Sequence, residues 1–176
     1  MKPIGVVRRV DDLGRIVIPK EIRKTLRIRD GEALEIFVEK DMIALKKYST
    51  MKDLDDVSAD LANSINQTLL KDVLVTDLDK VIATSVNKSD KYMEKRLSKY
   101  LENQMLTREI VIEKNIINIE FIDSTREKCS YVISPIISSG DAIGSVIVFS
   151  NTESISDLEV KMAALSANFL AKYIEQ

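Results

Sequence analysis

The first 48 residues set the narrowest limits on how this chain can fold. Their pattern predicts strands at 5–10 and 15–18, a short helix at 20–27, and strands at 33–38 and 42–45. A unit of this size is rarely stable alone and usually needs disulfides, a metal ion or oligomerisation. The chain has one cysteine and no histidine, so an intramolecular disulfide and a His/Cys zinc site are both excluded. We therefore expect an obligate dimer with shared or exchanged strands.

The remaining residues predict a larger second domain. Ser49 and Thr50 are expected to connect the two, which gives domains at 1–50 and 51–176. The expected helices lie at 51–70, 90–106 and 154–175, and the expected strands at 72–77, 80–86, 109–114, 116–122, 130–138 and 142–150.

The last expected helix carries apolar residues at heptad spacing: Ile155, Leu158, Met162, Leu165 and Phe169. This spacing is typical of the seam of a helix pair or bundle. A helix packed on the sheet of its own domain fits the same short pattern, so both interpretations stay open. We expect the first and last helices of the domain to pack in a bundle that pairs these domains between chains.

Missing residue types exclude several kinds of chemistry. Ser-His-Asp and Cys-His catalysis cannot be built without histidine, and the chain has no calcium-type loop, so we expect no enzyme, no catalytic residue and no metal. Cys129 is interpreted as structural rather than as a redox sensor, because there is no second cysteine to resolve it. Asp77 and Asp79 are interpreted as turn residues. No apolar run reaches transmembrane length and no signal-peptide core is present, so we expect a cytoplasmic protein without a membrane partner.

Charge is distributed unevenly along the chain. Residues 1–48 hold twelve Lys/Arg against eight Asp/Glu, whereas residues 49–176 hold fourteen against twenty. A basic head on an acidic body indicates an anionic partner for the head.

The expected helix in the head concentrates this charge. Lys20, Arg23, Lys24 and Arg27 follow the spacing i, i+3, i+4, i+7 and would share one face. Arg15 precedes the helix, and either Arg8 or Arg9 can join the same surface, because consecutive strand residues point to opposite faces. A solvated helix face is the alternative, but this density of cations favours binding to the phosphates of double-stranded DNA.

The head also resembles a known family. The run GVVRRVDDLGRIVIPKEIR at 5–23 is similar to the AbrB-type swapped-hairpin transition-state regulators, and the match extends over nearly all of 1–48. The resemblance implies an interleaved β-barrel dimer that binds DNA through Arg8, Arg15 and Arg23. Lys24 stands where the family often has arginine, so it keeps the charge but loses the bidentate fork. The resemblance further implies recognition of DNA shape, and both activation and repression of sporulation genes in the developing spore.

The second domain resembles GAF-like sensor domains in its element order and in the hairpin formed by residues 134–137 and 142–149. This resemblance implies a small ligand between sheet and internal helix. No other cofactor is expected. The two resemblances together imply a tetramer.

The sequence thus predicts an α+β protein: a swapped-hairpin β-barrel dimer followed by a GAF-like α/β sensor domain with an antiparallel sheet. Its expected function is that of a DNA-binding transcription regulator, associated with the nucleoid. An antitoxin is the alternative, because the same head occurs in toxin-neutralising proteins. Those carry a short disordered tail, whereas residues 51–176 are regularly patterned. An enzyme built on the second domain is a third reading, opposed by the missing histidines.

Overall fold

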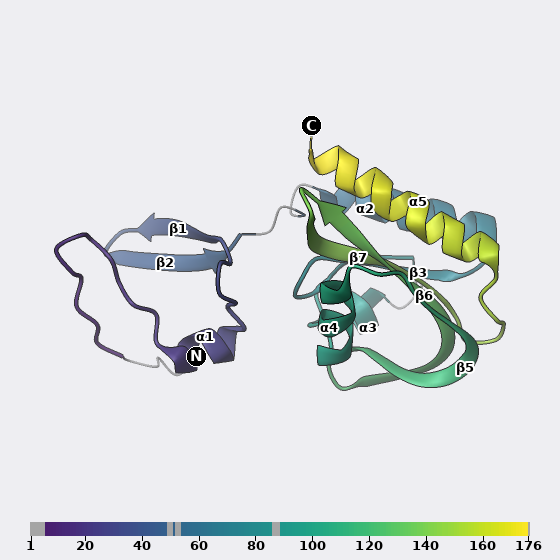
Figure 1. The fold of residues 1–176 in the computed structure, drawn as a ribbon, viewed down its shortest axis with the longest axis horizontal. Coiled ribbons are helices and arrows are strands. Elements are labelled where there is room, and N and C mark those ends of the chain that lie inside the picture. The colour runs from purple at the N-terminus through teal and green to yellow at the C-terminus, as the bar shows by residue number, and fades with distance from the viewer. Residues whose placement is uncertain (1–5, 49–50, 52–53, 86–88, 176) are drawn as a thin grey trace. The chain divides into compact units, whose positions relative to one another are not determined.

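The computed structural model describes residues 6–48, 51, 54–85 and 89–175. The chain divides into two compact units, Met1–Tyr48 and Ser49–Gln176 (Figure 1). The parts of the expected elements that fall on residues 5, 49, 50, 52, 53, 86 and 176 lie outside the described residues.

The first unit, called the head below, contains helix α1 (Lys20–Leu26) and the hairpin of β1 (Leu34–Glu39) and β2 (Met42–Lys47). The two strands pair antiparallel from Leu34↔Lys47 to Glu39↔Met42. Pro19 is the N-cap residue of α1, and Arg27 ends the helix in the left-handed conformation with φ of 53°.

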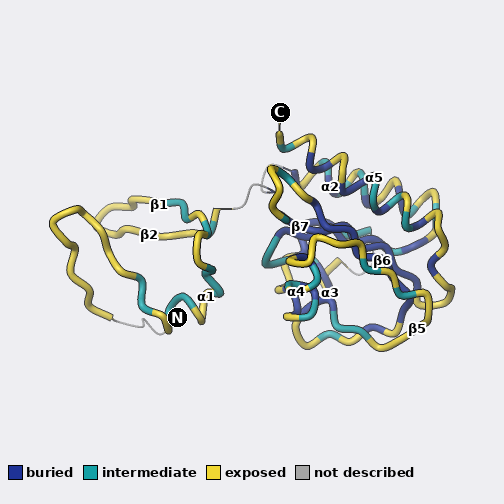
Figure 2. The backbone as a smooth tube through the Cα atoms, in the orientation of Figure 1, coloured by how far each residue is buried: buried dark blue, intermediate teal, exposed yellow. Residues whose placement is uncertain are grey.

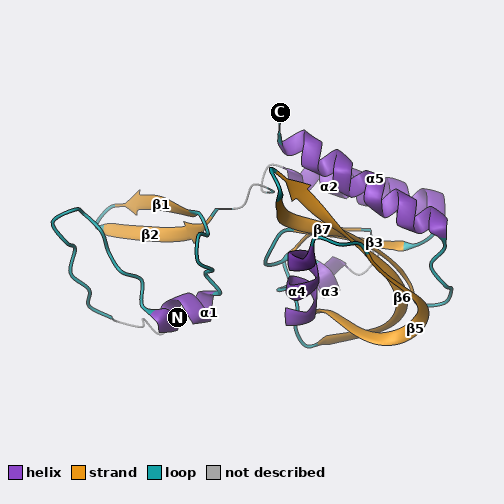
Figure 3. Cartoon of the chain, in the orientation of Figure 1, coloured by secondary structure: helices purple, strands orange, loops and turns teal. Residues whose placement is uncertain are grey.

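The strands expected at 5–10 and 15–18 are wrong for the single chain. Residues 6–10 and 15–18 have no strand structure, and Figure 3 draws them as loop. A strand needs a neighbour that pairs with its backbone N–H and C=O groups. Within the described part of the head, only β1 and β2 supply such a pairing, and they supply it to each other.

No residue between 6 and 48 is buried (Figure 2). Val7, Val17 and Val38 expose 90%, 76% and 74% of their surface, although their types belong in a core. The head of a single chain therefore has no hydrophobic core among its described residues.

The second unit is called the sensor unit below, after the resemblance noted for its sequence. It is built on a five-stranded antiparallel sheet of order β4-β3-β7-β6-β5. The strands are β3 (Asp72–Thr76), β4 (Val81–Thr84), β5 (Val111–Ile122), β6 (Thr125–Ser138) and β7 (Asp141–Ser150). Gly140, at φ of 87°, closes the expected turn between β6 and β7.

Helices cover both faces of this sheet (Figure 1). On one face, α2 (Asp55–Leu69) and α5 (Asp157–Ile174) pack on alternate strand residues such as Val73, Val132 and Val148. On the other face, α3 (Ser89–Tyr92) and α4 (Lys99–Thr107) pack on the intervening residues, such as Leu74 and Tyr131. Successive side chains of a strand point to opposite faces of the sheet, and helices cover both faces. The sheet therefore separates two hydrophobic cores.

The helix expected at 90–106 is wrong in its middle. Glu94 adopts φ of 59°, Leu97 forms a bridge with Ile122, and the Ser98 hydroxyl then caps α4 by accepting from the Leu101 N–H at 3.2 Å. The strands expected at 109–114 and 116–122 are one bent strand, β5, whose pairing with β6 shifts between Glu113 and Ile117.

The apolar seam of the last helix divides in the structure. α5 buries Ala163, Ala167 and Leu170 against its own sheet, and Ile155 is buried just before the helix. Leu158, Leu165 and Phe169 instead expose 55%, 63% and 48% of their surface. The helix therefore packs on its own domain through one face and leaves most of the predicted seam on the outside.

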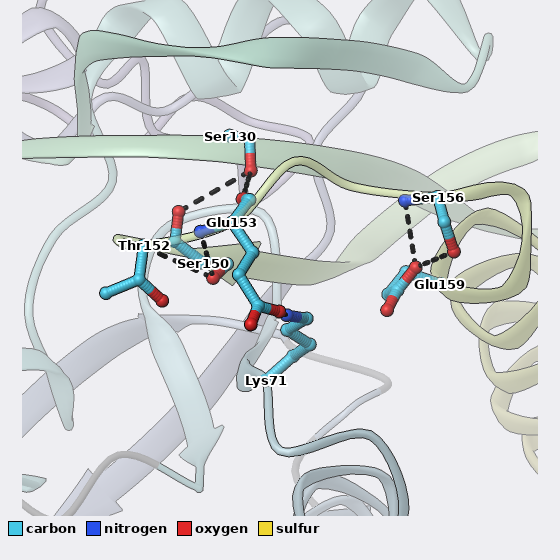
Figure 4. A network of polar contacts seen from close by, with 7 residues as sticks. All are labelled: Lys71, Ser130, Ser150, Thr152, Glu153, Ser156 and Glu159. Carbon is cyan, nitrogen blue, oxygen red and sulfur yellow. Dashed lines mark hydrogen bonds and ion pairs between the residues drawn. The ribbon is translucent and has the colours of Figure 1, made fainter.

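A polar network fixes the segment that leads from β7 into α5 (Figure 4). The ammonium of Lys71, a largely buried residue, pairs with the Glu153 carboxylate, and Ser130 donates to the Glu153 carbonyl oxygen. Ser156 and Glu159 form a reciprocal capping box at the first turn of α5. The position of α5 on the sheet is thereby set by backbone and side-chain bonds as well as by packing.

Candidate nucleic-acid interface

The basic face of α1 is shorter than the sequence predicts. Lys20 and Lys24 are exposed and Arg23 is half-buried, all within one turn of each other. Arg27 lies at the helix end in the left-handed conformation, so its side chain no longer follows the helical series. Three cations therefore share the face, with Arg27 beside its end.

Arg23 is held by an ion pair. Its Nη1 donates to Asp30 Oδ1 at 2.6 Å, across the turn that follows the helix. The Nε atom of Arg23 is buried and has no hydrogen-bond partner among the described residues. An unpaired buried donor costs free energy. In the single chain, the hydrogen-bonding capacity of the Arg23 guanidinium is therefore not fully satisfied.

Arg15 is held by the turn that precedes it. Asp11 Oδ1 accepts from the backbone N–H groups of Leu13 at 3.0 Å and Arg15 at 2.7 Å, and Asp11 Oδ2 accepts from Arg15 Nε at 2.8 Å. Gly14 closes the turn at φ of 75°. These bonds, first the one from the Arg15 backbone and then the one from its side chain, lower the pKa of the Asp11 carboxyl below its ordinary value.

Arg8 and Arg9 are exposed on the segment before this turn. The expected site residues thus form two groups in one chain: Arg8, Arg9 and Arg15 on the loop at 6–19, and the cations of α1. Sequence reasoning missed Asp11 and Asp30 as partners of the arginines. A signal for Asp11 was available, because an Asp that begins a turn bonds the backbone N–H groups that follow it, and Arg15 comes directly after the turn glycine.

The sensor unit has a filled core where the resemblance implies a ligand. Between the sheet and α3 and α4, the aromatic rings of Tyr92, Phe121, Tyr131 and Phe149 are each at most 3% exposed. Phe121 contacts Tyr131 edge-on at 5.3 Å and Phe149 at 5.6 Å between ring centroids. Side chains thus occupy the middle of this layer.

Two other candidate residues have structural roles. Asp77 Oδ1 accepts from the N–H groups of Asp79 and Lys80, both at 2.7 Å, which is turn chemistry as predicted. Cys129 is fully buried, and burial raises the pKa of its thiol to about 12, so little reactive thiolate is present near neutral pH.

The described residues provide neither a metal-binding cluster nor a membrane-spanning helix. No group of three or more His, Cys, Asp or Glu in that part of the chain is placed to hold a metal ion. No helix within it is long and apolar enough to cross a membrane.

Comparison of the sequence with known proteins shows which family the chain belongs to. The model described as "Stage V sporulation protein T C-terminal, transcription factor" matches residues 53–175. Stage V sporulation protein T of Bacillus subtilis (strain 168) is 42% identical over 178 aligned residues, which cover all of both chains. The chain belongs to the stage V sporulation protein T family. The family's description as a transcription factor confirms a sporulation-related transcription regulator and agrees with the expectation of no enzyme.

The head of this chain also matches proteins outside that family. The transition state regulatory protein AbrB of Bacillus subtilis (strain 168) is 58% identical over 48 residues, which are 27% of this chain and 50% of the relative. A second model, described as "Antidote-toxin recognition MazE, bacterial antitoxin", matches residues 7–53.

The sensor unit has the fold of a GAF domain. That of an Acinetobacter phosphoenolpyruvate-protein phosphotransferase aligns with a TM-score of 0.59 at 13% identity, covering 74% of this chain and 84% of the other. The expected α+β class, with an AbrB-type unit before a GAF-like one, is confirmed.

Proposed function

We propose that this regulator binds double-stranded promoter DNA through the head, with Arg8, Arg9, Arg15, Lys20, Arg23, Lys24 and Arg27 as the contacting cations. One observation carries the proposal. Within twenty residues, seven cations lie on the loop at 6–19, on α1 or at the end of α1, none of them is buried, and Arg15 exposes 70% of its side chain. Phosphate neutralisation by such a surface releases counterions and makes binding sensitive to salt.

The head acts as a dimer in this proposal. The absence of any buried residue at 6–48 is the support, because valines and isoleucines on the loop and on both strands then require cover from outside the chain. The loop segments around Arg8 and Arg15 also lack strand partners, which a second copy would supply by exchange. Dimerisation doubles the number of cations on the DNA-binding surface.

The sensor units join two such dimers into a tetramer. The outward face of α5 supports this step, because Leu158, Leu165, Phe169 and Tyr173 are all exposed there by 45% or more. Exposed apolar residues that follow one helix face are typical of a contact between helices. We propose that this unit also receives the regulatory signal, and that the protein activates some sporulation promoters and represses others, at the nucleoid in the cytoplasm of the developing spore.

An antitoxin is the second candidate, favoured by the antitoxin model that matches 7–53. A neutralising segment would have to lie in the sensor unit, where the described residues form a sheet with helices on both faces. This arrangement favours the regulator, because a toxin-wrapping tail orders on its partner rather than packing on its own core.

The experiment is binding of the full-length protein to A/T-rich promoter DNA over a salt series, beside Arg15→Ala and Arg23→Ala. We expect both variants to bind more weakly and to lower the slope of log K against log salt by roughly one unit per chain. Lys128→Ala removes the same charge from the sensor unit and should bind like the parent. A folded parent that does not bind DNA even at low salt would reject the proposal, and equal binding by all four proteins would reject the assignment of the surface.

A further inference from the structure

We infer that Asp11 is a positioning residue that holds the Arg15 guanidinium in the orientation used on DNA. The inference rests on the proposed function and adds an acidic residue to a surface that otherwise works by positive charge. Its basis is geometric: one carboxylate bonds the side chain of Arg15 through Oδ2 and the backbone of the same residue through Oδ1. Both ends of Arg15 are thus held by a single group.

The bond to Nε leaves the other end of the arginine available. A guanidinium has five N–H donors in a planar fork, and Nε supplies one of them. The four donors on Nη1 and Nη2 keep the paired geometry that matches phosphate oxygens or the edge of a guanine. Arg15 exposes 70% of its side chain, so this fork is held in solvent, where a long side chain would otherwise sample many rotamers.

The carboxylate itself is fixed by the turn. Besides its two bonds to Arg15, Asp11 accepts from the Leu13 N–H at 3.0 Å, and its backbone pairs with that of Arg15 at 3.1 Å and with the Gly14 N–H at 3.0 Å. An ordinary exposed ion pair at this spacing is weak because both side chains must be ordered to form it. Here the turn orders one partner in advance, so the arginine is the only group left to fix.

Electrostatics alone predicts the opposite effect. A carboxylate beside a phosphate-binding surface repels DNA, so replacing it by a neutral residue should tighten binding. Positioning predicts that the same replacement weakens binding, because the arginine then has to be ordered at the expense of affinity. The sign of the change therefore separates the two explanations.

The neighbouring Asp12 provides a matched control. It lies in the same turn, is exposed, and makes no contact with a cation in the part of the chain that the structure describes. Asp12→Asn removes the same charge from almost the same place without touching Arg15. Asp11→Asn keeps a carbonyl oxygen that can accept from the backbone of the turn, so the local fold should persist.

The experiment measures promoter binding and thermal unfolding of full-length parent, Asp11→Asn, Asp12→Asn, Arg15→Ala and the double variant Asp11→Asn with Arg15→Ala. We expect Asp11→Asn to weaken binding roughly threefold to tenfold, as for the loss of one preorganised charged contact. Asp12→Asn should bind as tightly as the parent or more tightly. In the Arg15→Ala background, Asp11→Asn should cause no further weakening, because its effect passes through that arginine.

Two results would overturn the inference while leaving DNA binding by the head in place. One is Asp11→Asn binding as tightly as Asp12→Asn. The other is Asp11→Asn weakening the Arg15→Ala protein as much as it weakens the parent, which would assign its effect to the turn alone. A folded parent that fails to bind DNA would instead remove the proposed function, and this inference with it.

Discussion

Gly144 on β7 has no room for a side chain. A Cβ atom at this position would lie 2.0 Å from the carbonyl oxygen of Thr76 on the neighbouring strand β3. Because that oxygen belongs to the backbone, relief requires the two strands to separate. We predict that Gly144→Ala lowers the free energy of unfolding by about 1–3 kcal/mol or more, as for an overpacked core, measured by urea denaturation.

Gly140 in the β6–β7 turn is the matched control for this prediction. No atom lies within 4 Å of its ideal Cβ position, so Gly140→Ala meets only the strain of φ at 87°, about 1 kcal/mol. An equal loss of stability in the two variants would show that strand contact at Gly144 is not the cause.

Residue roles could be predicted from the sequence where the chemistry is local. The turn role of Asp77 follows from its position between two expected strands. The structural role of Cys129 follows from the absence of a second cysteine in the sequence. The contact of Asp30 with Arg23 could not be predicted, because it depends on how the chain turns after α1. The close approach at Gly144 depends on strand register, which no single strand specifies.

At the scale of elements, the start of α5 tests how far local bonds stabilise a helix. The Ser156 hydroxyl accepts from the Leu158 N–H at 3.2 Å, and Glu159 accepts from the Ser156 N–H at 2.9 Å. We predict that Ser156→Ala lowers the free energy of unfolding by about 1 kcal/mol at neutral pH, as for the loss of an N-cap. Ser154→Ala, which removes a hydroxyl that donates to the Lys114 carbonyl oxygen outside the helix, should cost less.

The same capping box gives the Ser156→Ala effect a pH dependence. Burial opposes the ionised form of Glu159, but bonds from its own backbone and from Ser156, aided by the charge of Lys71, hold the pKa of this carboxyl below its ordinary value. A lowered pKa adds stability above the ordinary value and loses it as pH falls through the lowered one. The difference between parent and Ser156→Ala should therefore shrink in urea titrations below about pH 4. A stability difference between the two proteins that stays constant with pH would show that ionised Glu159 does not contribute to the cap.

Elements were predictable where their partners lie within the chain. The long amphipathic helices α2 and α5 and the strands β3 and β7 were found at the expected places, because their period reflects burial against the same domain. The strand expected at 130–138 was found as part of β6, which begins earlier, at Thr125. The strand expected at 5–10 failed because residues 6–10 have no strand partner among the described residues of the single chain. The helix expected at 90–106 failed because Leu97 pairs with Ile122, a contact between distant residues.

At the scale of the whole molecule, the apolar pattern of the last helix allows two interpretations: a contact with another helix, or packing on the sheet of its own domain. The structure assigns these two roles to different faces of α5. Its inward face is small and close-packed, with Ala163, Ser166 and Ala167, whereas three of the five heptad residues lie outside: Leu158, Leu165 and Phe169. A periodicity measured along one helix cannot distinguish these two faces, because both repeat with nearly the same period. Assembly is thus the level that a single sequence and a single chain specify least.

The outward face of α5 leads to the last prediction. Leu165 exposes 63% of its surface, so Leu165→Asp should leave the domain folded while placing a charge in the middle of the apolar stripe. If sensor units pair through this stripe, the variant should fall from a tetramer to a dimer held by the head, as measured by sedimentation velocity with circular dichroism as the check on folding. Burying an unpaired carboxylate between helices costs more than the contact gains.

Asn168→Asp places the same charge on an exposed residue at the flank of the stripe and should stay tetrameric. A Leu165→Asp protein with the same assembly as the parent would show that α5 is not the contact, and a monomeric parent would remove the dimeric head as well.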